Sequence, residues 1–150
     1  MELQYAEQAA VSSAWFRRAP LKRPATLVDW ELAEPGWKTV VEQRLSKIQA
    51  YQPGWDGYAS KPPGASVIGF ARSILQAVMP ADAPAPSIVP FSGGGIQLEW
   101  HANGFDIELA IYAPFKAELS VEANDGRPPL EDKPLSANYS LLGQAIAELI

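Results

Sequence analysis

Residues 96–111 read Ile-Gln-Leu-Glu-Trp-His-Ala-Asn-Gly-Phe-Asp-Ile-Glu-Leu-Ala-Ile, and this stretch decides the fold. Apolar and polar side chains alternate on both sides of Asn103-Gly104, which is the pattern of half-buried β-strands. Asn-Gly between two such runs predicts a two-residue hairpin, because both residues tolerate the positive φ angles of a type I′ turn. The stretch therefore predicts the centre of an antiparallel sheet.

The register of this hairpin follows once Asn103-Gly104 is placed at the turn. The apolar residues then face one another in three pairs, Trp100–Ile107, Leu98–Leu109 and Ile96–Ile111. A slip of one residue would carry the whole apolar set to the other face, so this register is strongly specified. The opposite face carries two further pairs, Glu99–Glu108 and His101–Asp106.

The polar pairs are the first candidate site. Like charges directly opposed across a ladder are destabilising, so such a pair is either screened by water or kept because a cation binds there. We therefore predict that Glu99, His101, Asp106 and Glu108 bind a partner. An alternative remains open, since carboxylates beside an imidazole could ligate a divalent cation or act as an acid/base pair in a small metal-dependent hydrolase. A flat sheet, however, does not supply the concave pocket of an enzyme.

Three apolar stripes at helical spacing predict three helices around this sheet. Two precede it; the second is ended by Pro80 and has Ser66 as its expected N-cap. The third follows the sheet. The stripes consist of Trp37, Val40, Val41, Leu45, Ile48 and Tyr51; of Val67, Phe70, Ala71, Ile74, Leu75 and Val78; and of Leu141, Leu142, Ala145, Ile146 and Leu149.

Two further strands complete a β-meander of about four strands. Ser87–Phe91 alternates before the hairpin, and its proline places it at an edge, while residues 116–122 alternate after the hairpin. Residues 127–134 are proline-rich and are expected to form a loop. Helices packed on one face of an antiparallel meander define an α+β two-layer sandwich. We expect a single domain over residues 1–150, with residues 1–23 as a flexible or docking arm.

Composition and charge limit the classes of protein and the kinds of partner that fit this chain. The 150 residues are 47% hydrophobic, contain no cysteine and have no apolar run long enough for a membrane span. With no signal-peptide pattern at the N-terminus, we expect a cytoplasmic protein without cofactor or metal. The net charge is −5, and residues 80–126 hold a single base, Lys116, against seven acids. Acidic surface favours a basic protein or nucleoprotein partner and disfavours direct nucleic-acid binding.

Trp55-Asp56-Gly57-Tyr58, between the first two helices, is the second candidate site. In one interpretation Asp56 accepts backbone N–H bonds in a tight turn and both aromatic side chains pack into the core. In the other, Trp55 and Tyr58 are a partly exposed pair that anchors a partner, as aromatic residues do at hot spots. We include Trp55, Asp56 and Tyr58 among the predicted partner-binding residues.

The same motif carries a resemblance. Trp55-Asp56-Gly57-Tyr58 with Pro62, followed by Pro86, Val89-Pro90 and the run Gly94-Gly95-Ile96-Gln97-Leu98-Glu99-Trp100, resembles the signature of a family of small, largely uncharacterised bacterial proteins. The likeness covers residues 53–112, and this chain has Ala59 where a glycine is frequent. The resemblance implies a bacterial or mobile-element setting, where such proteins are often accessories or inhibitors. We therefore expect a non-enzymatic module that acts as an inhibitor, an antitoxin or an anti-defence accessory.

Overall fold

The computed structural model describes residues 34–150 of the chain. The predictions made for residues 1–23, and with them the prediction of one domain over the whole chain, lie outside the described residues.

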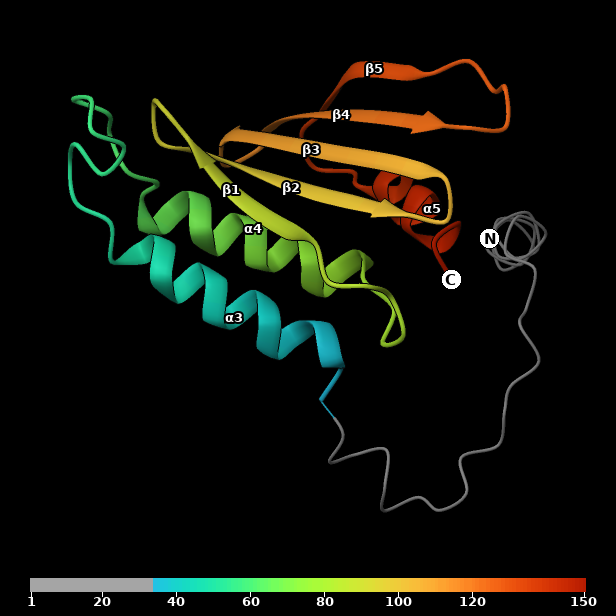
Figure 1. Cartoon of the computed structure of the whole chain (residues 1–150), viewed down its shortest axis with the longest axis horizontal. Coiled ribbons are helices and arrows are strands. Elements are labelled where there is room, and N and C mark those ends of the chain that lie inside the picture. The colour runs from blue at the N-terminus through green and yellow to red at the C-terminus, as the bar shows by residue number, and fades with distance from the viewer. Residues whose placement is uncertain (1–33) are drawn as a thin grey trace, which may run out of the picture. The chain divides into compact units, whose positions relative to one another are not determined.

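A five-stranded antiparallel sheet forms one layer, and each of its strands pairs with the next along the chain (Figure 1). The strands are β1 (Ser87–Phe91), β2 (Gly95–Ala102), β3 (Phe105–Ala113), β4 (Lys116–Ala123) and β5 (Leu130–Leu135). The predicted meander is thereby confirmed, with β1 at one edge as its proline indicates.

The central hairpin has the register that the sequence specifies. Trp100 pairs with Ile107 and Glu99 with Glu108, and the other predicted pairs also match. Asn103 and Gly104 have φ angles of 51° and 76°, the left-handed values that a type I′ turn requires at both central positions. The turn and the apolar matching therefore select the same alignment.

The expectation of a loop over residues 127–134 is wrong for residues 130–134, because β5 forms there, and holds for residues 127–129. Every second N–H of an edge strand points away from the sheet, so Pro134 is accommodated without losing a ladder bond. The ladder between β4 and β5 is interrupted beside Ser120, and Asp132 takes a φ of 45° there. The Asp132 N–H donates to the Ser120 hydroxyl at 3.1 Å, which replaces the missing backbone partner.

Three helices cover one face of this sheet: α3 (Gly36–Gln49), α4 (Ala65–Val78) and α5 (Ser140–Ala147) (Figure 1). The predicted stripe of α3 is buried at Trp37, Val41, Leu45 and Ile48. Val40 is 52% exposed, and Tyr51 lies after the end of α3 and is half-buried. The N-cap of α4 is Gly64, so the prediction of Ser66 is wrong. Before α5, Asn138 accepts the Ser140 N–H at 2.9 Å through its side chain.

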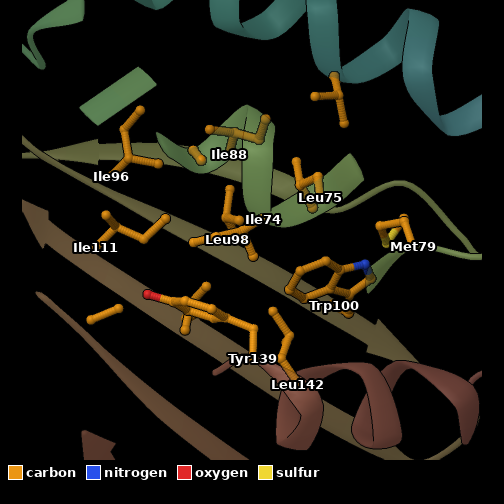
Figure 2. Packing of buried hydrophobic residues seen from close by; sticks show 14 of the residues in the cluster. Ile74, Leu75, Met79, Ile88, Ile96, Leu98, Trp100, Ile111, Tyr139 and Leu142 are labelled. Atoms are coloured by element: carbon orange, nitrogen blue, oxygen red, sulfur yellow. The ribbon is translucent and has the colours of Figure 1, made fainter. Parts of the chain in front are cut away.

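The core lies between the two layers. Apolar side chains of the sheet meet those of the helices there; Figure 2 labels Ile74, Leu75, Met79, Ile88, Ile96, Leu98, Trp100, Ile111, Tyr139 and Leu142. The indole N–H of Trp37 donates to the Pro80 carbonyl and that of Trp100 to the Pro84 carbonyl, each at 3.1 Å. Both bonds tie the connector between α4 and β1 to the core. No Asp, Glu, Lys, Arg or His within residues 34–150 is buried, so these charged groups lie at the surface, whereas the Tyr139 hydroxyl is buried.

The β1 edge of the sheet is protected from pairing with another strand. Arg44 reaches from α3 and donates through Nε to the Ile88 carbonyl at 2.9 Å. Pro90 has no N–H to offer on the same strand. An edge with occupied or missing hydrogen-bonding groups is a poor template for strand addition. The β1 edge is therefore a poor site for pairing with a strand of another chain.

A pair of neighbouring substitutions tests which face is buried. Leu109→Ala should lower the free energy of unfolding by about 2–5 kcal/mol, because its fully buried side chain leaves a cavity. Glu108→Ala, on the opposite face, should change it by less than about 0.5 kcal/mol. Urea denaturation followed by circular dichroism measures both, and equal losses would contradict the assigned faces.

Candidate partner-binding surface

Carboxylates from three neighbouring strands gather on the sheet face that the helices leave open. Glu99 lies opposite Glu108, and Asp106 lies opposite both His101 and Glu122. We call these five residues the acidic face. The two lysines of the sheet lie elsewhere, one opposite Ala113 where β4 begins and one on β5. The four residues predicted from the hairpin are thus brought together as expected.

Glu122 is the member that the sequence analysis missed. Its partner Asp106 was identified, but the register between β3 and β4 could not be counted from the sequence. The turn after Ala113 lacks an Asn-Gly signal, and the ladder shifts between Ile111 and Ala113. The signal that could have found Glu122 was the alternation of β4 itself, in which Glu122 follows the apolar Val121.

His101 links two of the carboxylates. Its Nδ1 lies 2.6 Å from Oδ1 of Asp106, and its Nε2 lies 3.6 Å from Oε2 of Glu99. The hydrogen bond with Asp106, and after it the longer contact with Glu99, raises the pKa of His101 above its ordinary value. Glu99 also accepts a 2.9 Å bond from the Gln97 amide. Glu108 and Glu122 have no cation of this kind beside them within the part of the chain that the structure describes.

Shallow hollows border the acidic face. One of about 370 Å³ surrounds the β2–β3 turn and is lined in part by His101, Asp106 and Glu122. Another, of about 150 Å³, lies between β3 and β5 beside Glu108 and Leu130. Asp106 and Glu122 line both hollows, so the acidic face is not flat.

The loop that carries the second candidate site is an Asx turn, as the first interpretation predicts. Oδ1 of Asp56 accepts the Tyr58 N–H at 3.0 Å, and Oδ2 accepts the Ser60 hydroxyl. The bond from Ser60, more than any other contact, lowers the pKa of Asp56. Gly57 has a φ of 82°, the left-handed conformation that glycine adopts most readily.

The two aromatic side chains of this loop differ in their environment. Trp55 is half-buried and stacks on Tyr51 with ring centroids 5.2 Å apart. Tyr58 is 79% exposed, so the expectation that both side chains pack into the core is wrong for Tyr58. An exposed aromatic ring on a hydrogen-bonded loop is available to a partner.

The structure does not bring the two candidate sites together. The loop with Trp55 lies beside the β1–β2 turn, where a Cβ added to Gly94 would lie 3.5 Å from the Pro62 carbonyl oxygen. His101 and Asp106 lie beside the β2–β3 turn, at the other end of β2 (Figure 1). The seven predicted residues therefore form two separate groups, of which the acidic face is the larger.

Two further findings concern residues 34–150 alone. No group of three or more His, Asp or Glu side chains in this range is arranged to hold a metal ion, so the hydrolase alternative finds no ligand set there. None of the helices in the same range is both long enough and apolar enough to cross a membrane.

Comparisons with protein-family models, with curated proteins and with solved structures gave no match. The resemblance to the small bacterial family stays a prediction. The fold and the surface define the chain as an α+β sandwich with an acidic open face.

Reversing one charge tests the cost of the Glu99–Glu108 pair. Glu108→Lys replaces a like-charge pair by an opposite-charge pair, so it should raise the free energy of unfolding by about 0.2–1 kcal/mol at low salt. The gain should shrink in 1 M NaCl, where charges are screened. Glu108→Gln is the matched control and should give a smaller gain. A loss of stability in Glu108→Lys at low salt would show that the pair is not repulsive.

The aromatic loop gives a second prediction. Trp55→Ala should lower the free energy of unfolding by more than about 1 kcal/mol, because it removes the stacking on Tyr51. Tyr58→Ala should leave it within about 0.5 kcal/mol, because the side chain is mostly exposed. Thermal and urea denaturation measure both, and the reverse order would contradict the described loop.

Proposed function

We propose that the protein is a non-enzymatic binding module that docks its acidic face on a basic surface of a partner and thereby blocks or regulates that partner. The observation that carries the proposal is the opposition of Glu99 to Glu108 and of Asp106 to Glu122, with His101 as the one group among them that can carry a positive charge. Opposed carboxylates lower the stability of the free protein, and such costs are typical of surfaces kept for function.

Charge complementarity specifies the kind of partner. Carboxylates on adjacent strands present oxygen acceptors at regular intervals, which suits the ammonium and guanidinium groups of Lys and Arg. Complementary charges accelerate association and exclude partners of the wrong sign. A nucleic-acid backbone would be repelled by the same face, so the proposed partner is a basic protein or the protein part of a nucleoprotein.

Within this class we favour an inhibitor, an antitoxin or an anti-defence accessory of a bacterium or a mobile element. The bacterial setting rests on the sequence resemblance, and the blocking role rests on the acidic face. Tyr58 on its separate loop is a second contact for a partner large enough to reach both ends of the sheet. The proposal includes a cytoplasmic setting, which a chain without cysteine accommodates.

Affinity capture with a matched charge control tests the proposal. The full chain is immobilised, exposed to bacterial extract and eluted with increasing salt, and the bound proteins are identified by mass spectrometry. The double variant that combines Glu99→Gln and Glu108→Gln should no longer capture a basic protein that the unmodified chain retains. The capture should weaken as the salt concentration rises, because screening reduces the attraction.

The control removes the same number of negative charges away from the sheet. Glu34 pairs with Lys38 at the start of α3, and Glu148 pairs with Arg127 after α5. Glu34→Gln with Glu148→Gln should leave the capture unchanged. Equal loss of capture in both double variants would show that net charge, and not the acidic face, attracts the partner.

A further inference from the structure

The single histidine of the chain sits between two carboxylates, one at each ring nitrogen. Asp106 lies 2.6 Å from Nδ1 and Glu99 lies 3.6 Å from Nε2. A neutral imidazole has one N–H and one lone pair, and the lone pair would face a carboxylate oxygen and be repelled by it. Only the imidazolium presents an N–H toward both carboxylates. The geometry therefore selects the protonated form.

The remaining charged groups around His101 have the same sign. Glu122 of β4 lies with His101 and Asp106 on the hollow at the β2–β3 turn. On the other side, the hollow between β2 and the connector before β1 is lined in part by Ser87 and Glu99, and His101 is the only basic residue among its described lining. The charged neighbours of His101 in these described surroundings are thus Glu99, Asp106 and Glu122, and all three favour the proton.

We propose that His101 is a pH-responsive charge switch of the acidic face. With His101 protonated, the four carboxylates and one imidazolium carry a formal charge of −3, and loss of the proton takes it to −4. The same step removes the shared counter-ion of Glu99 and Asp106. Because His101 is 52% exposed at its side chain, solvent exchanges the proton without any opening of the fold.

The inference deepens the proposed function, on which its consequence for binding rests. A basic partner should bind more tightly as the pH rises through the pKa of His101, since its cations then meet an uncompensated face. The contribution of His101 to the stability of the folded chain depends on pH in the opposite direction. A pKa raised by folding stabilises the folded chain below the ordinary value near 6.5, and this contribution is lost as the pH rises through the folded pKa.

Titration of His101 by NMR tests the switch without any partner. The chain contains one histidine, so the Cε1–H signal of the full-length protein reports this side chain alone. Between pH 5 and 9 the midpoint should lie above 6.5. Asp106→Asn and Glu99→Gln should each lower it, with the larger drop in Asp106→Asn because that contact is shorter. A midpoint at or below 6.5, or one unchanged in both variants, would overturn the proposal.

Binding of a synthetic hexa-arginine peptide tests the consequence. Calorimetry at low salt should show binding to the unmodified chain that is about two- to fivefold tighter at pH 8.5 than at pH 6.0. His101→Gln should bind the peptide with the same affinity at both pH values. Equal affinity of the unmodified chain at the two pH values would overturn the switch.

The two proposals fail separately in these measurements. A raised midpoint together with no peptide binding at either pH would count against the acidic face as a docking surface for basic groups, while the charge switch stands on the titration. Peptide binding together with an ordinary midpoint would support the docking surface and overturn the switch.

Discussion

The register of the β2–β3 hairpin is the constraint on which the rest of the structure depends. Asn103-Gly104 supplies the two left-handed residues of the turn, and the apolar side chains then meet in matched pairs. This one alignment turns Trp100 and its apolar neighbours toward the helices. It also places Glu99 opposite Glu108 on the other face. The core and the acidic face are therefore two consequences of the same pairing.

The sequence predicts the parts of the fold that burial dictates. Alternation on β2 and β3 and helical stripes on α3 and α4 are strong signals, because one side of each element is apolar. The prediction fails where a proline or a turn, and not burial, determines the strand boundaries and the register. Because Pro134 lies in a proline-rich segment, the edge strand β5 was predicted as a loop. Because the ladder shifts before Ala113, the pairing of Glu122 with Asp106 could not be predicted. Trp55 and Tyr58 were left open between a core and an exposed position, because nothing in a tight turn specifies which side chain faces inward.

The acidic face combines features that a surface selected only for stability would avoid. Carboxylates oppose one another on adjacent strands, and the His101 ring contacts both Glu99 and Asp106. The β1 edge beside this face is protected by Arg44 and Pro90, so association through added strands is disfavoured there. In the proposed function a basic partner binds the broad face, and in the proposed switch the proton on His101 sets the charge that this partner meets.

Disulfide trapping tests the central register most directly, because the chain has no cysteine of its own. Counted from the Asn103-Gly104 turn, Glu99 and Glu108 form a non-hydrogen-bonded pair, whose side chains are close enough for a disulfide. Glu99→Cys with Glu108→Cys should oxidise to an intramolecular disulfide in the folded protein. Glu99→Cys with Ile107→Cys should not, because Ile107 faces the helices. A disulfide only in the second variant would contradict the register, and with it the acidic face.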